Sequence, residues 1–394
     1  MNALERWVHW VVFVCLLAGC AAPGRLPETG ATAPTVPTAG WNPDRLDDAF
    51  RLAERYGSCS LIVMTHGKII RSRGDLTTPH RVHSVRKALL GALVGQHAGS
   101  GPGQVDLGAT LEELGIDDRP GPLTPLQKQA TVLHLVKSTS GINHDAAGEI
   151  PSMTRQKARR LGTAPNEPGT IWAYNNWDYN ALTTIFEQTT GLRVGHAFLK
   201  GIAQPLGMQD FDESSVFYLK KEALSMHAKA GFRMSARDLA RFGQVYLDKG
   251  MWQGRQIIPA AWVERITADY TPTHNSGLGS GHGYLWWVPC DRKARSMGLP
   301  AGSFIASGWA GQHIVVIPAW DTVIVHTVST DDYFGFCVRW ARKKGFDLDQ
   351  AVRYSRTTCR QPGHMSDPFC QRCRYYTGRD FETLLAKIIA ARSF

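Results

Sequence analysis

Ser84 and Lys87 are a serine and a lysine whose types and spacing can do chemistry. On a helix, residues i and i+3 lie on the same side, so the Ser84 hydroxyl and the Lys87 amine can meet. A serine hydroxyl is a weak nucleophile that needs a base, and a desolvated lysine has a lowered pKa and can accept its proton. The pair predicts a nucleophilic serine, although Ser-x-x-Lys alone is also a common surface pattern.

Two later segments carry groups that can complete such a site. Residues 168–176 read Pro-Gly-Thr-Ile-Trp-Ala-Tyr-Asn-Asn, in which Tyr174 can transfer a proton and Asn176 can hold the lysine or a substrate carbonyl. Residues 307–312 read Ser-Gly-Trp-Ala-Gly-Gln and lead into a predicted strand, where small residues let a substrate approach the backbone. The N–H of Gln312 is a candidate oxyanion donor. Each segment alone is equally typical of a polar loop or a glycine-rich turn.

The hydrophobic pattern predicts the elements that position these groups. Helices are expected over 43–56, 84–97, 235–247 and 381–391, and strands over 60–64, 68–71, 284–288, 313–317 and 322–328. Ser235 is placed as the N-cap of its helix, with Asp238 in a variant capping box. Strands near both ends and helices between them predict an α+β fold, an α/β sandwich. In it an antiparallel sheet is flanked by the N- and C-terminal helices, and a mostly helical domain is inserted.

The expected domain organisation follows from this order. Residues 41–82 and 270–394 form an α/β domain, with a cysteine-rich insertion at about 337–378. Residues 83–269 form the helical domain that carries the nucleophile. A site between two such lobes is a natural pocket for a substrate.

The N-terminus predicts a targeting segment. A short apolar run over residues 7–18 ends in Leu-Ala-Gly-Cys20, which resembles the lipobox of bacterial lipoproteins. That resemblance implies a signal peptide over 1–19 and a membrane anchor through lipidated Cys20, with a plain signal peptide or anchor as the alternative. Ala21 in place of Asp implies outer-membrane sorting, and residues 20–40 have the composition of a flexible tether. We therefore expect a periplasmic lipoprotein that is anchored at the outer membrane.

The charge and the cysteines limit the remaining function classes. The formal net charge of +10 comes from scattered basic residues without a nucleic-acid-binding signature, so we expect no nucleic-acid partner. Six cysteines follow the leader: Cys59, Cys290, Cys337, Cys359, Cys370 and Cys373. Export favours disulfides, with fifteen possible pairings. A zinc site that includes His364, or free thiols, are the alternatives.

The order of the motifs along the chain resembles the serine β-lactamase and penicillin-binding-protein superfamily, with the β-lactamase/transpeptidase-like fold. The resemblance extends from about residue 45 to 330 and favours the class C type with its esterase and amidase relatives. It implies Ser84 as the nucleophile, Lys87 as its base partner, Tyr174 as the second proton-transfer group and Asn176 as a polar anchor. Which of the lysine and the tyrosine is the acylation base stays open. No cofactor or metal is expected.

The third segment departs from the penicillin-recognising members. The resemblance implies an oxyanion hole of the Ser84 and Gln312 N–H groups, with Trp309 and Gly311 beside the substrate. Those members carry Lys-Thr-Gly or His-x-Gly here, and Trp309 offers an aromatic face without a charge. We therefore expect hydrolysis of small esters or amides through a Ser84 acyl-enzyme. The alternatives are a D,D-peptidase or β-lactamase acting on cell-wall peptides or penicillins, and a non-catalytic peptidoglycan-binding lipoprotein.

Overall fold

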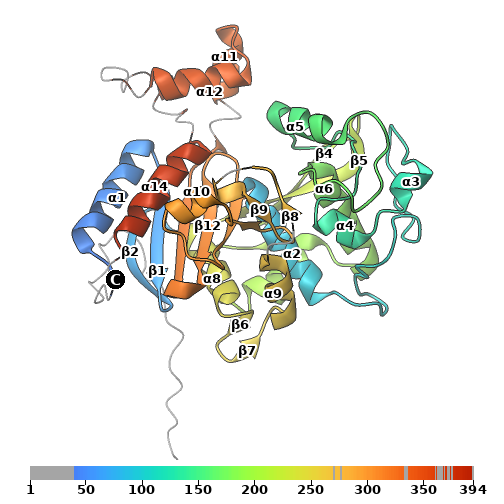
Figure 1. Cartoon of the computed structure of the whole chain (residues 1–394), viewed down its shortest axis with the longest axis horizontal. Helices are drawn as coiled ribbons and strands as arrows, with labels where there is room; N and C mark the ends of the chain where they lie inside the picture. Colours follow the sequence, from blue (N-terminus) through green and yellow to red (C-terminus); the bar gives the residue numbers. More distant parts are fainter. Residues whose placement is uncertain are drawn as a thin grey trace, which may run out of the picture.

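The computed structural model describes residues 40–268, 271–275, 277–331, 336–359, 361, 367, 369–370, 373 and 376–392. In this part of the chain the largest sheet is antiparallel, with the strand order β2-β1-β13-β12-β11-β10-β9-β8 (Figure 1). Its strands are β1 (Ser60–Thr65), β2 (Lys68–Gly74), β8 (Thr271–Pro272), β9 (Gly281–His282), β10 (Trp287–Val288), β11 (Phe304–Gly308), β12 (Gln312–Ile317) and β13 (Thr322–Thr327). Segments from both ends of the chain therefore meet in one sheet, where β1 pairs with β13.

Helices cover this sheet and fill the middle of the sequence. They are α1 (Pro43–Tyr56), α2 (Arg86–Gln96), α3 (Pro125–Lys128), α4 (Val132–Val136), α5 (Pro151–Leu161), α6 (Asn176–Thr190), α7 (Val194–Phe198), α8 (Ala236–Leu247), α9 (Ala260–Thr267), α10 (Arg292–Ser296), α11 (Val338–Lys343), α12 (Leu348–Thr357) and α14 (Gly378–Ala390). A second sheet has the order β3-β5-β4, with β3 (His80–Arg81), β4 (Val216–Lys221) and β5 (Ser225–Met234). A small hairpin is formed by β6 (Met251–Trp252) and β7 (Arg255–Gln256).

The central strands of the large sheet are buried on both faces. Successive side chains point to opposite sides of the sheet, so each strand contributes to two cores. Leu61 and Val63 of β1 belong to a core with α1 and α14, which lie side by side at one edge of the molecule (Figure 1). Ile62 and Met64 belong to a second core that includes α2, α6 and α8. The sheet between terminal helices, with helices inserted in the middle of the chain, confirms the predicted α+β fold.

The inserted helical part is tied together by one buried carboxylate. Asp118 accepts hydrogen bonds from Trp177 Nε1 at 2.6 Å, Ser225 Oγ at 2.9 Å and the Met226 N–H at 3.0 Å, and it pairs with His144 at 3.1 Å. Burial acts to raise the pKa of Asp118, but these hydrogen bonds outweigh it and hold the pKa below its usual range. The carboxylate therefore links α6, β5 and the loop before α5, which all border the candidate site.

The predicted elements are largely present, with two differences. The β1–β2 hairpin and the strands β12 and β13 are confirmed, and Ser235 caps α8 by accepting a hydrogen bond from the Asp238 N–H. The Asp238 carboxylate does not complete a capping box, because it accepts from two backbone N–H groups elsewhere in the chain. The strand predicted over 284–288 is wrong for most of its length, since Leu285 has a φ of 74° and only β10 remains.

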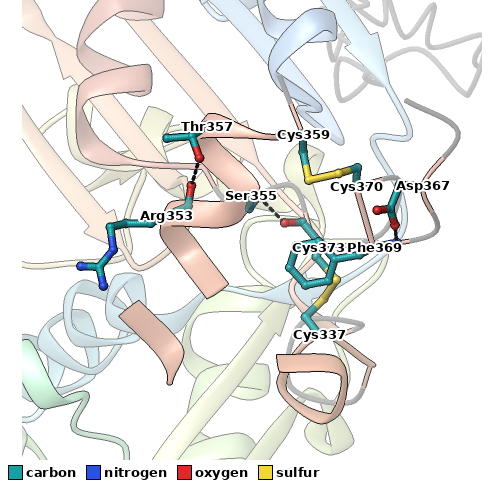
Figure 2. Close-up of a disulfide and its surroundings, with 9 residues drawn as sticks. All are labelled: Cys337, Arg353, Ser355, Thr357, Cys359, Asp367, Phe369, Cys370 and Cys373. Atoms are coloured by element: carbon teal, nitrogen blue, oxygen red, sulfur yellow. Dashed lines mark hydrogen bonds between the residues drawn. A yellow bond between two sulfur atoms is a disulfide. The ribbon is translucent and has the colours of Figure 1, made fainter. Parts of the chain in front are cut away.

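The cysteine-rich segment forms a small module that stands above the sheet, with α11 and α12 at the top of Figure 1. Cys337 is bonded to Cys373 and Cys359 to Cys370, as Figure 2 shows. The disulfide interpretation is confirmed for these four residues, and the zinc interpretation is wrong for them because their thiolates are not available as ligands. Cys59, which export also led us to expect in a disulfide, is a free thiol.

Several predictions concern segments that the structure does not test. The predicted signal peptide and Cys20 lie outside the described residues, as does the tether up to residue 39. Over the part of the chain that is described, no helix is long and apolar enough to cross a membrane. The domain boundaries stay a prediction. Helix α8 packs on the large sheet, although the prediction assigned its residues to the helical domain.

Candidate active site

The backbone turn that presents Ser84 connects β3 to α2. The predicted helix over 84–97 begins as a 3₁₀ turn, η1 (His83–Val85), and becomes α-helical only at Arg86. His83 has a φ of 48°, which lets the chain reverse sharply before the serine. Gly308, at the end of β11, lies against this turn, and a Cβ there would lie 3.2 Å from the Ser84 backbone nitrogen. A glycine at this position is what allows β11 to approach the serine so closely.

Lys87 lies one turn further on and is held beside Ser84. Its Nζ donates hydrogen bonds to Ser84 Oγ at 2.9 Å and to Asn176 Oδ1 at 3.0 Å. The amine also lies 4.5 Å from the ring centroid of Tyr174 and 4.7 Å from that of Tyr179. The side chain is 2 % exposed, so bulk water does not compete for its contacts. The i and i+3 geometry predicted for the serine and lysine is therefore present.

The environment of Lys87 disfavours its charged form. Burial lowers the pKa of Lys87 well below its usual range, and the positive charges of Arg86 and Lys229 lower it further, while Glu149 acts in the opposite direction. A neutral amine has a lone pair and can accept a proton. The Lys87 amine, 2.9 Å from the serine hydroxyl, is therefore a candidate base.

Tyr174 has the opposite shift. Burial raises the pKa of Tyr174 to about 12, although a hydrogen bond with Ser84 and the nearby charge of Arg86 act to lower it. The ring is surrounded by aromatic side chains, with Trp287 at 5.2 Å and His282 at 6.2 Å between centroids. The phenol is therefore protonated at neutral pH and can donate a hydrogen bond but is a poor base.

Asn176 is positioned by the start of α6. Asn175 is the N-cap of this helix and accepts a hydrogen bond from the Asp178 N–H at 2.9 Å. The Asn176 N–H donates to Glu149 Oε1 at 3.1 Å, and the same carboxylate is paired with the buried Lys157 at 2.9 Å. Because its backbone is fixed in this way, the Asn176 side chain is oriented toward Lys87.

The structure separates the residues predicted in the third segment. Trp309 lines the same cavity as Ser84. Gly311 lies elsewhere, because its carbonyl accepts a hydrogen bond from His326 at 2.6 Å and a Cβ there would meet the Tyr376 ring. Gln312 is fully buried with its amide donating to the Val328 carbonyl, while its partner in the β11–β12 ladder, Gly308, is the residue against Ser84. The predicted roles of Gly311 and Gln312 receive no support from this placement.

A cavity of about 510 Å³ opens beside Ser84. Its wall is shared by η1, α2, the start of α6, the segment before α5, β4, β5 and Trp309. The residues used below are Ser84, Arg86, Glu149, Asn176, Lys229 and Trp309. The cavity is large enough for a small organic substrate, with Ser84 in its wall.

Sequence reasoning missed the charged residues around this cavity. Arg86 is 1 % exposed, Lys157 is also buried, and Lys229 lines the cavity from β5. The sequence offers only a weak indication for Arg86, which is a charged residue among the apolar positions of α2. No local pattern connects Lys229 or Lys157 with Ser84, since they come from other elements and meet the site only through the tertiary fold.

The disulfide module reaches the cavity through Trp309. This side chain packs against the cluster of Cys337, Cys359, Phe369, Cys370 and Cys373, and it contacts the His83 ring at 5.3 Å. Ser355 Oγ also donates to the Cys373 carbonyl (Figure 2). The module therefore supports one wall of the cavity that Ser84 lines.

Replacing Cys337 and Cys373 together with alanine is expected to loosen this module. The bond closes a loop with a sequence separation of 36 residues, so its loss costs about 4 kcal/mol of local stability by loop entropy. Hydrogen exchange is expected to accelerate in α11 and α12 but not in β12 or β13. The matched control is Cys59→Ala, which removes a free thiol. Unchanged exchange in α12 of the double variant would show that packing alone holds the module.

The fold and the site define the class of protein. A sheet closed by both ends of the chain, with a Ser-x-x-Lys pair at a cavity, is the architecture of β-lactamase/transpeptidase-like proteins. The chain belongs to the beta-lactamase family, because the model of that family matches residues 44–344. This assignment confirms the predicted superfamily and indicates a hydrolase.

Named relatives and solved structures agree with this family. The chain is 25% identical over 280 residues to "6-aminohexanoate-dimer hydrolase" of Paenarthrobacter ureafaciens, covering 64% of this chain and 67% of the relative. A putative 6-aminohexanoate-dimer hydrolase from Bacillus anthracis has a TM-score of 0.52 at 21% identity, covering 76% of this chain and 83% of that one. EstCE1, a hydrolase with promiscuous acyltransferase activity, has a TM-score of 0.51 at 16% identity, covering 72% and 92%. These two structures share the fold.

Proposed function

We propose that this protein is a serine hydrolase that forms an acyl-enzyme on Ser84 and cleaves small esters or amides. The observation that carries the proposal is the Lys87 amine, which is buried, has a lowered pKa and lies 2.9 Å from Ser84 Oγ. One relative bears the name "6-aminohexanoate-dimer hydrolase", which supports hydrolysis as the reaction class.

The proposed acylation step uses the neutral Lys87 as the base. As Ser84 Oγ attacks the substrate carbonyl carbon, its proton passes to Lys87 Nζ, and the carbonyl electron pair moves to oxygen. The Ser84 backbone N–H is a candidate donor to that oxyanion. Collapse of the intermediate breaks the bond to the leaving alcohol or amine, which takes up a proton. Attack of water on the ester of Ser84 then releases the acid and restores the hydroxyl.

The contrast between Lys87 and Tyr174 supports this assignment of roles. The lowered pKa of Lys87 makes its neutral form more accessible than that of an ordinary lysine, whereas a phenol with a pKa of about 12 is not ionised near pH 7. We therefore assign Lys87 as the acylation base. Tyr174, which is hydrogen-bonded to Ser84, passes a proton toward the leaving group.

The substrate class follows from Trp309 and from the named relatives. An aromatic residue beside the nucleophile, in a segment where penicillin-recognising members carry a cation, favours simple esters and amides over penicillins.

From the sequence we also propose a periplasmic location, with Cys20 lipidated at the outer membrane. This second proposal is independent of the chemistry at Ser84.

The test is labelling and turnover with the purified protein. We expect a fluorophosphonate probe to add one adduct per chain by intact mass, and p-nitrophenyl esters to be cleaved much faster than nitrocefin. Comparable rates for the two substrates would favour a β-lactamase. The absence of both labelling and turnover would favour a non-catalytic binding protein, and either result would contradict the proposal.

A further inference from the structure

Lys229 lines the cavity and has no counter-ion in the described part of the chain. It lies on β5, opposite Leu219 of β4, and both line the cavity. Its side chain passes over Gly148, where an added Cβ would lie 3.1 Å from the lysine Nζ. No hydrogen bond or ion pair joins Lys229 to any described residue. An anion from outside the chain would stabilise the charged form of this partly buried lysine, which burial disfavours.

Arg86 adds a second positive charge from the cavity wall. It is 1 % exposed, and its NH2 group donates a hydrogen bond to Asn180 Oδ1 at 2.8 Å. Among the described residues, its Nε and NH1 groups have no hydrogen-bond acceptor and no carboxylate pairs with it. Two cations close together without a counter-ion repel each other. Burial, and then the charge of Arg86, lower the pKa of Lys229 to about 7.

The acidic side chain of the cavity is already used. Glu149 accepts from Lys157 Nζ at 2.9 and 3.1 Å and from the Asn176 N–H at 3.1 Å. Asp331, near the rim, is paired with Arg81 at 2.9 Å. The cavity beside Ser84 therefore has an excess of positive charge.

We propose that Lys229 binds a carboxylate of the substrate, with Arg86 adding positive potential from the wall, so that the preferred esters or amides are anionic. This inference rests on the proposed hydrolase function and names the substrate class for it. Penicillin-recognising members carry a cation in the third segment, where this chain has Trp309. The cations of the present inference come instead from α2 and β5.

Matched substrates test the proposal. The first pair is p-nitrophenyl hydrogen glutarate and p-nitrophenyl pentanoate, which place a carboxylate or a methyl group at the end of the acyl chain. The second pair is 4-carboxyphenyl and 4-carbamoylphenyl pentanoate, which test the leaving-group side. We expect the wild-type kcat/KM to favour the carboxylated member of at least one pair. Equal values within both pairs would overturn the inference without any variant.

Variants then assign the preference to Lys229. Lys229→Met removes the charge, and we expect it to reduce kcat/KM for the carboxylated ester by roughly 10- to 100-fold more than for the neutral one, as for a charged hydrogen bond. Lys229→Arg is expected to keep the preference. Lys220→Met, an exposed lysine on β4 outside the cavity, is the matched control and is expected to change neither substrate.

The outcomes separate this inference from the proposed function. A preference that survives in Lys229→Met would overturn the role of Lys229. Hydrolysis of all four esters at equal rates would leave Ser84 as the nucleophile and refute only the anionic substrate class. Failure of the wild type to cleave any ester or react with a fluorophosphonate would refute the hydrolase proposal itself.

Discussion

Ser84→Ala is expected to abolish turnover, with kcat for p-nitrophenyl esters lower by about 10⁴-fold or more, as for loss of a catalytic serine elsewhere. The substitution removes the only atom that forms the proposed acyl-enzyme bond. It also removes the group that receives a hydrogen bond from Lys87 at 2.9 Å. The same variant is expected to show no fluorophosphonate adduct by intact mass.

The stability of Ser84→Ala shows whether its loss of activity comes from misfolding. Ser84 is only partly buried and lines the cavity, so removing one oxygen leaves the core packing intact. We expect the melting temperature to change by no more than a few degrees. A matched control for labelling is Ser138→Ala, a buried serine bonded to Tyr179 outside the cavity lining, which is expected to retain the adduct. Labelling that persists in Ser84→Ala would show that another residue is the nucleophile.

Lys87→Met is expected to reduce kcat/KM by about 10²- to 10⁴-fold, the usual contribution of a general base. Methionine keeps most of the volume of the lysine side chain but offers no amine to accept the serine proton. The variant is not expected to destabilise the protein strongly, because it removes a buried amine whose charged form is already disfavoured. Asn176 then loses its donor at 3.0 Å, so a modest fall in stability is expected.

The pH dependence of the wild type tests the same role with a defined sign. Activity requires the neutral amine, so kcat/KM rises as pH increases through the lowered pKa of Lys87 and is level at higher pH. If Lys87 had the pKa of an ordinary lysine, kcat/KM would continue to rise up to about pH 10. Because the pKa of Tyr174 is about 12, its ionisation produces no fall in rate across the neutral range.

Tyr174→Phe separates the two candidate bases. If the lysine is the base, this variant loses less activity than Lys87→Met and keeps the rising limb of the pH profile. Loss of that limb in Tyr174→Phe, with its retention in Lys87→Met, would assign the base to the tyrosine. The measurement is kcat/KM for one p-nitrophenyl ester across the stable pH range of each variant.

Much of the site was predictable because its groups come from short motifs. Ser84 and Lys87 are three residues apart, so helix geometry alone brings their side chains together. The complete burial of β1, β12 and β13 likewise agrees with their runs of apolar residues whose β-preference is strong. The order of the motifs was sufficient to indicate the family, which the match over residues 44–344 confirms.

The remaining features depend on contacts between distant segments, which no local pattern encodes. The pairing of Cys337 with Cys373 was one of fifteen possibilities, and folding alone determines which sulfur atoms meet. Gly308, rather than Gln312, lies against the serine because the strand register places it there.

The sequence by itself determined which residues have the chemistry for acyl transfer. Only the tertiary structure decided how far their pKa values shift and which charged residues line the cavity. The pKa of Lys87 is lowered by burial among α2, α6 and β5, by its sequence neighbour Arg86, and by Lys229, which lies near it only after folding. Likewise, Lys229 is a cavity residue because β5 passes beside Ser84, from which it is 145 positions away along the chain (229 − 84). Desolvation and long-range charge are properties of the packed molecule, so they emerge only when distant segments meet.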